Sequence, residues 1–161
     1  MGRLRRSQKF LSRAERGGLA RLANDCLLEQ MFLELMGDMV ESDDDQPGDE
    51  ELGQGPVYVL DSKGAVGAGW MRATRHRVIL ITGPKRERYE VATGAITELR
   101  EVSPDCAGLG EARALVWEVD DESHCLRIVA PADSPVWGAL RTVTAPRRRA
   151  PSRGQTSSRL R

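Results

Sequence analysis

The sequence has few aromatic residues, few cysteines and no net charge. Phenylalanine, tyrosine and tryptophan make up 4% of the 161 residues, so a core must be built mainly from aliphatic side chains. The cysteines are Cys26, Cys106 and Cys125, an odd number with no Cys-x-x-Cys pair. This spacing argues against a zinc finger or a disulfide framework, and it favours reduced thiols in a cytoplasmic protein.

Long apolar runs are also missing. No run reaches the ~18 residues that a membrane-spanning helix needs, and the basic start is not followed by the compact apolar segment of a secretion signal. No pattern typical of a catalytic nucleophile, a nucleotide-binding glycine loop or a metal-ligand set occurs. We therefore expect no enzymatic activity, no cofactor and no metal. The expected location is cytoplasmic, with peripheral contact with a membrane as an alternative.

The zero net charge hides a segregation of charge along the chain. Residues 22–52 carry eleven acidic residues and no basic one, whereas residues 141–161 carry seven arginines and no acidic residue. Blocks of one sign favour charged partners or each other. Arg147, Arg148 and Arg149 are therefore predicted to bind polyanions such as nucleic acid weakly, by charge alone. Neutralisation of the basic tail by the acidic block is the alternative.

Composition divides the chain into four parts. They are a helical segment (1–40), an acidic linker (41–54), a folded domain (55–143) and a basic tail (144–161). In the first part, Ser12 and Glu15 match a capping box, and Gly17-Gly18 is predicted to break the helix soon after it. The linker is rich in Asp, Glu, Gly and Pro, a composition that buries too little apolar surface to repay its ordering.

The helical residues after the double glycine carry a wide apolar side. From Leu19 to Val40, apolar residues recur at spacings of three and four, which is typical of an amphipathic helix. Four of them are the predicted interface: Leu28, Phe32, Leu35 and Met39. Exposed, they would form a larger patch than monomers usually tolerate, so the helix must pack on the domain or on a second copy. Self-association is slightly favoured, because a flexible linker does not by itself fix docking on the domain.

The domain reads as strands followed by one helix. Seven segments with strand patterns lie at 57–60, 68–74, 77–82, 88–92, 96–102, 114–119 and 125–130. The helix is predicted over 133–142, where Ser134-Pro135 suits a helix start and Val136, Trp137 and Leu140 recur at helical spacing. This order predicts a mainly β, α+β fold: a seven-stranded antiparallel barrel capped by the helix, with Trp137 buried at one end.

The segment from Gly69 to Leu80 carries a family resemblance. Its residues Gly-Trp-Met-Arg-Ala-Thr-Arg-His-Arg-Val-Ile-Leu are similar to the second and third strands of bacterial pleckstrin-homology-like (PH-like) and GRAM-like domains. Those domains show glycine, an apolar strand, threonine, a basic turn and a second apolar strand. The strands around Tyr89 and Ile96 and the terminal helix with its central tryptophan agree as well. The resemblance covers residues 55–143 and implies a PH-like barrel that binds a ligand.

The resemblance leaves more than one type of ligand open. In such folds, basic residues near the first strands can bind lipid head groups, and the spacing of Lys63, Arg75 and Arg77 is similar to that of phosphoinositide binders. A solvated basic rim is the other interpretation of these residues. An open sheet edge and a groove beside the helix are suited to peptide docking. We therefore predict a non-catalytic module that binds a protein partner, with anionic lipid or polyanion binding as the alternative.

Overall fold

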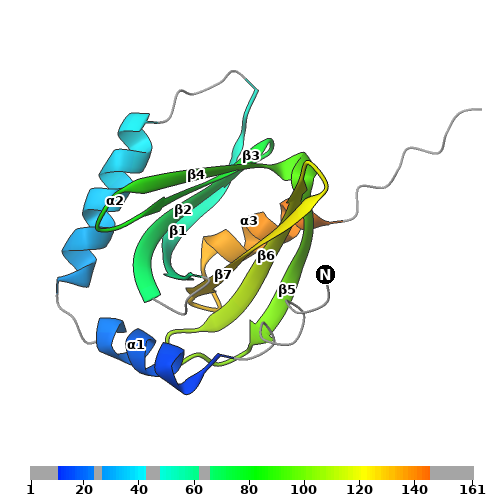
Figure 1. The fold of residues 1–161 in the computed structure, drawn as a ribbon. Coiled ribbons are helices and arrows are strands. Elements are labelled where there is room, and N and C mark those ends of the chain that lie inside the picture. The colour runs from blue at the N-terminus through cyan, green and yellow to red at the C-terminus, as the bar shows by residue number, and fades with distance from the viewer. Residues whose placement is uncertain (1–10, 24–26, 43–47, 62–65, 146–161) are drawn as a thin grey trace, which may run out of the picture.

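A computed structural model describes residues 11–23, 27–42, 48–61 and 66–145 of the chain (Figure 1). Two helices come first, and a third follows the strands. The helices are α1 (Arg13–Ala23), α2 (Leu28–Ser42) and α3 (Pro135–Thr144). The strands are β1 (Glu51–Leu60), β2 (Val66–Thr74), β3 (Arg77–Thr82), β4 (Glu87–Ala92), β5 (Ile96–Ser103), β6 (Glu111–Val119) and β7 (Glu122–Ala130). A short 3-10 turn, η1 (Thr93–Ala95), links β4 to β5.

The seven strands form one antiparallel sheet in the order β4-β3-β2-β1-β7-β6-β5. The predicted α+β fold, with seven antiparallel strands and a closing helix, is confirmed. Closure into a barrel is not observed, because β4 and β5 stand at opposite ends of the sheet order. The turn η1 redirects the chain between these two strands, and β1 and β7 join the halves through three register pairs. The sheet is therefore bent and open along one side.

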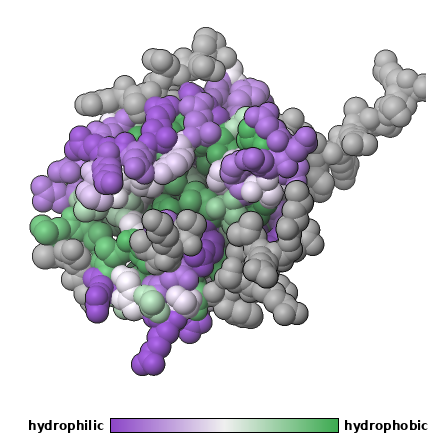
Figure 2. All heavy atoms as spheres, viewed as in Figure 1, coloured by the Kyte–Doolittle hydropathy of each residue, from purple (hydrophilic) through white to green (hydrophobic). Residues whose placement is uncertain are grey.

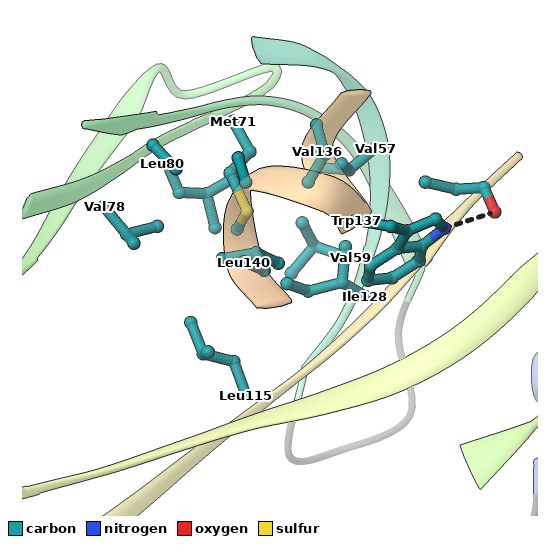
Figure 3. Packing of buried hydrophobic residues seen from close by; sticks show 13 residues of the cluster. Val57, Val59, Met71, Val78, Leu80, Leu115, Ile128, Val136, Trp137 and Leu140 are labelled. Carbon is teal, nitrogen blue, oxygen red and sulfur yellow. Dashed lines mark hydrogen bonds between the residues drawn. The ribbon is translucent and has the colours of Figure 1, made fainter. Parts of the chain in front are cut away.

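Helix α3 fills the space between the two halves of the sheet (Figures 1 and 3). The Ser134 hydroxyl accepts a hydrogen bond from the Val136 N–H at 3.3 Å, and Pro135 occupies the first turn, as the sequence predicts. The Trp137 side chain is fully buried, and its indole N–H donates to the Ala130 carbonyl oxygen at 3.3 Å. The predicted burial of Trp137 is confirmed. The helix begins and ends two residues later than predicted.

Strand β1 is longer than the sequence indicates. It begins at Glu51, whereas we predicted a strand from Val57. Residues 51–54, assigned to the linker, therefore belong to the strand, and three of these four pair with β2. Gly53 explains part of this difference. A Cβ atom at this position would lie 2.7 Å from the Pro135 carbonyl oxygen, so the absence of a side chain lets α3 pack directly on β1.

Helices α1 and α2 cover the outer faces of the sheet (Figure 1). The predicted capping box is confirmed, because the Glu15 N–H donates to the Ser12 hydroxyl at 3.1 Å and the Ser12 N–H to the Glu15 carboxylate at 3.3 Å. The predicted break at Gly17-Gly18 is wrong, since α1 continues through both residues. Gly18 instead gives close packing on β2, where a Cβ atom would lie 3.2 Å from a Val66 methyl group.

The buried ion pair between Glu15 and Arg127 fixes α1 to β7, with 2.9 Å between the carboxylate and guanidinium groups. In α2, Leu35 and Met39 are buried against Ile79 and Ile81 of β3. None of the described helices is both long and apolar enough to span a membrane.

Candidate functional site: the open edge of the sheet

The arginines predicted to bind lipid form ion pairs with carboxylates of the same chain. Lys63 lies outside the described residues. Arg75 is exposed at the β2–β3 turn, with its Nε 3.0 Å from a Glu50 carboxylate oxygen. Arg77 is largely buried, with its Nε 3.1 Å from Asp49 Oδ2 and its Nη1 3.5 Å from Glu90 Oε1. The two arginines do not form an unoccupied basic rim, and their role in ligand binding stays a prediction.

Asp49, which precedes β1, bonds to the β2–β3 turn, and the sequence analysis did not predict this contact. Its side chain is 4% exposed, and its Oδ1 accepts a hydrogen bond from the His76 backbone N–H at 3.1 Å. Burial acts to raise the pKa of Asp49, but the bonds from Thr74, His76 and Arg77 outweigh it and lower that pKa below its ordinary value. Composition assigned Asp49 to a linker. The only sequence signal was the opposite charge of two segments, which does not specify the pairing.

This pKa shift predicts how acid destabilises the fold. A carboxyl group with a lower pKa in the folded state contributes stability above its unfolded pKa of ~3.9, and that stability is lost as the pH falls toward the folded value. The free energy of unfolding should therefore drop more steeply between about pH 5 and pH 2 in the natural chain than in Asp49→Asn. Urea unfolding over this range measures both slopes. Glu50→Gln is the control, because its exposed ion pair contributes little. Parallel pH profiles for the natural chain and Asp49→Asn would contradict the prediction.

Three of the four predicted interface residues of α2, namely Phe32, Leu35 and Met39, lie against the chain's own sheet. Leu28, Leu35 and Met39 are buried, and Phe32 makes an edge-on aromatic contact with Tyr58 of β1, with 5.6 Å between ring centroids. Of the two alternatives left by the sequence, docking on the domain is observed. Self-association through the helix, which the sequence slightly favoured, stays a prediction. The sequence could not decide this, because the apolar spacing that suits a helix partner also suits a sheet.

Strand β4 ends the sheet, and the hydrogen-bond pattern shows where its backbone groups point. The Thr93 N–H donates to the His76 carbonyl oxygen at 2.9 Å, one register position beyond the pair Arg77↔Ala92. Hydrogen-bonded and non-hydrogen-bonded pairs alternate along an antiparallel ladder. The backbone N–H and C=O groups of Thr93 and of every second residue before it therefore point toward β3. Glu90 and Ala92 direct their backbone N–H and C=O groups away from β3, toward the side on which none of the described strands lies.

The side chains of β4 alternate between the two faces of the sheet. Tyr89 is opposite Leu80, a residue of the central core, and so lies on the inner face, whereas Glu90 is opposite Ile79 on the face covered by α2. Tyr89 is 50% exposed, and its hydroxyl donates to a Glu87 carboxylate oxygen at 2.8 Å. In Figure 2, hydrophilic residues cover the upper part of the viewed face, and hydrophobic residues are visible below them. The edge thus combines polar side chains with a partly exposed aromatic ring.

The other end of the sheet, β5, is less regular. Its pairing with β6 shifts register between Ile96 and Glu98 and again between Glu101 and Ser103. Bulges of this kind twist an edge strand and interrupt its ladder, which hinders pairing with another strand. Strand β4 instead pairs with β3 without interruption through all six of its residues. Of the two described edges, β4 is therefore the better template for an added strand.

The remaining reactive side chains of the described residues include a buried thiol, a partly buried thiol and a stacked imidazole. Cys106 is buried, and burial raises its pKa to about 11, so its thiol is protonated at neutral pH. Burial also raises the pKa of Cys125. His124 stacks on Trp117 with 5.6 Å between ring centroids. No three His, Cys, Asp or Glu residues of the described segments gather as metal ligands.

Neither a protein-family model nor a curated protein matches the chain. Several solved structures are similar to it. The C-terminal domain of an unknown protein from Leishmania infantum is 12% identical, with a TM-score of 0.49, over 73% of this chain and 97% of that one. The DH/PH domains of PDZ-RhoGEF in complex with activated RhoA are 14% identical, with a TM-score of 0.49, over 81% of this chain and 39% of that one. The hSac2 domain of the human phosphoinositide phosphatase Sac2 is 9% identical, with a TM-score of 0.44, over 71% and 75% of the two chains.

The architecture follows from the strand order and from the helix packed between the two halves of the sheet. This arrangement agrees with the PH-like fold that the sequence resemblance implies. The bacterial and GRAM-like parts of that resemblance stay predictions.

Proposed function

We propose that the chain is a non-catalytic interaction module that binds an extended segment of a protein partner along the edge of β4. The observation that carries this proposal is the regular, one-sided pairing of β4, which leaves the backbone N–H and C=O groups of Glu90 and Ala92 pointing away from the sheet. An added strand would bind through main-chain hydrogen bonds, and pockets or surfaces beside alternate side chains would select its sequence. Tyr89 offers an aromatic surface on the inner face.

The charges at the β2–β3 turn support a protein partner over an anionic lipid. A phosphate group would have to displace Glu50 from Arg75 and the buried Asp49 carboxylate from Arg77. Displacing Asp49 would also remove the hydrogen bond to the His76 N–H. Weak polyanion binding through Arg147, Arg148 and Arg149 stays a separate prediction based on charge, because these residues lie outside the described part of the chain.

Ala92→Pro tests the proposed site with little change to the fold. Ala92 already has φ −65°, the value that a proline ring imposes, and its N–H points away from β3. The substitution removes one outward donor and places the ring where an added strand would lie. Peptides selected from a random displayed library against the natural full-length chain should bind Ala92→Pro about tenfold more weakly, which corresponds to about 1.4 kcal/mol and is within the range for one lost hydrogen bond.

Gly94→Ala is the matched control for this experiment. It lies two residues further along the chain, and an added Cβ atom meets no other atom within 4 Å. Fluorescence anisotropy of a labelled selected peptide gives the affinity of each variant, and thermal unfolding checks that both are folded. A library from which no peptide is enriched, or peptides that bind Ala92→Pro as tightly as the natural chain, would overturn the proposal.

A further inference from the structure

We infer that the extended segment bound by β4 is β4 of a second copy of this chain, which would make the module a symmetric dimer. The inference rests on the proposed function, because it names the partner of the same edge. A symmetric dimer needs a self-complementary surface, in which each group meets its complement across a two-fold axis. The short sequence Arg88-Tyr89-Glu90 has this property when two β4 strands pair antiparallel about Tyr89.

The charges of β4 match in this register. With the axis at Tyr89, Arg88 of each copy lies opposite Glu90 of the other. Each Glu90 already contacts Arg88 and Arg77 of its own chain, at 3.4 Å and 3.5 Å, and in the dimer it would gain the Arg88 guanidinium group of the second copy as a further partner. Both side chains lie on the outer face of the sheet, where Arg88 is opposite Ile81 and Glu90 opposite Ile79 within the chain. Opposite charges directly across two strands stabilise their pairing, and like charges destabilise it.

The backbone matches in the same register. Arg88 and Glu90 belong to the alternate set whose N–H and C=O groups point away from β3. Residues of this set must lie opposite each other for two edges to form a continuous antiparallel ladder. The register about Tyr89 places Arg88 opposite Glu90 and thereby meets the condition for hydrogen bonding as well as the condition for charge.

The two nearest registers with the same backbone match fail on charge. An axis at Glu90 places the two Glu90 carboxylates opposite each other, and an axis at Arg88 does the same with the two guanidinium groups. Sliding one strand by a single residue places a residue whose backbone groups point outward opposite one whose backbone groups bond to β3. In these registers the hydrogen-bonded ladder does not form. Among these registers, the charge pattern of β4 favours the alignment about Tyr89.

The inner face adds an aromatic contact to this alignment. The two Tyr89 residues are directly opposite each other in a non-hydrogen-bonded pair, the type in which side chains approach most closely. Tyr89 is 50% exposed in the single chain, so the contact would cover surface that the fold itself leaves open. Aromatic pairs across strands stabilise antiparallel pairing.

Charge-swap variants of the full chain test the inference. Sedimentation equilibrium should show a dimer for the natural chain. Arg88→Glu and Glu90→Arg should each raise its dissociation constant at least about tenfold, since both symmetry-related pairs turn from attractive to repulsive. The double variant Arg88→Glu/Glu90→Arg should restore the dimer. Arg100→Glu is the matched control, because Arg100 contacts Glu98 of its own strand β5 at 2.8 Å, as Arg88 contacts Glu90 of its own strand β4 at 3.4 Å. It should leave the dissociation constant unchanged.

Two outcomes would overturn the inference. One is a natural chain that remains monomeric up to millimolar concentration, and the other is a dimer that the double swap does not restore although thermal unfolding shows a folded protein. A monomeric chain that binds displayed peptides, and loses them on Ala92→Pro, would refute self-pairing and leave the proposed function intact. A dimer that responds to the swaps as described supports the inference.

Discussion

Trp137→Ala should lower the free energy of unfolding by about 3–5 kcal/mol, the range for removing a large buried aromatic side chain. The side chain is fully buried between the two halves of the sheet, and its indole N–H donates to the Ala130 carbonyl oxygen (Figure 3). The Arg113 guanidinium carbon lies 5.4 Å from the ring centroid, at a distance suited to a cation–π interaction. Truncation would remove all three interactions and leave a cavity. Urea unfolding followed by circular dichroism gives the difference.

Trp137→Phe separates the burial of this ring from its hydrogen bond. Phenylalanine keeps most of the apolar contact but leaves the Ala130 carbonyl oxygen without the indole donor. The expected loss is about 1–3 kcal/mol, the usual range when a buried polar group loses its partner. A Trp137→Ala variant that loses less than its Phe counterpart would contradict the assignment of α3 as the central element of the core.

The sequence predicted the elements of the domain better than their ends. Alternation and turn residues located all seven strands, because a strand buried on one face must alternate and a turn must carry residues that tolerate it. The start of β1 was missed for a different reason. Glu51 and Gln54 are polar residues of a strand end, and the glycine between them has no side chain to reveal a periodicity. The close approach of α3 to Gly53 explains part of this difference, and that approach is a property of the fold.

Closure of the sheet could not be predicted from the sequence. A closed barrel and an open, bent sheet have the same strands in the same order, and they differ in whether β4 and β5 pair. That difference depends on the direction in which η1 sends the chain and on the volume occupied by α3. Neither quantity appears in a one-dimensional pattern. The outward backbone groups of β4, on which the proposed site depends, were therefore also beyond the sequence analysis.

The pairing of charged residues in the domain could not be predicted from the sequence either. The sequence established a block of acidic residues before the domain and basic residues at the β2–β3 turn. It did not establish that Asp49 would be buried against Arg77, because the composition of the block resembles that of a linker. The apolar side of α2 that the sequence predicted is present, and it packs on the sheet of the same chain. Patterns identify surfaces that must be covered, and the fold determines what covers them.

The docking of α2 predicts a large effect from a residue far from the proposed edge. Met39→Ala should lower the free energy of unfolding by about 2–5 kcal/mol, because Met39 is fully buried with Leu35 against Ile79 and Ile81 of β3. Leu33→Ala is the matched control on the same helix. Leu33 is 55% exposed, so its truncation should change stability by no more than about 0.5 kcal/mol.

Amide hydrogen exchange would connect this packing to the edge strand. Strand β3 lies between α2 and β4, since its outer residues contact the helix and its backbone pairs with β4. Loosening the helix by Met39→Ala should therefore raise the exchange rates of the amides that join β3 to β4, at positions 87, 89 and 91. Equal effects of Met39→Ala and Leu33→Ala on stability and on these rates would show that the helix does not support the sheet. The expected asymmetry would show instead that α2 holds the strand on which the proposed edge is built.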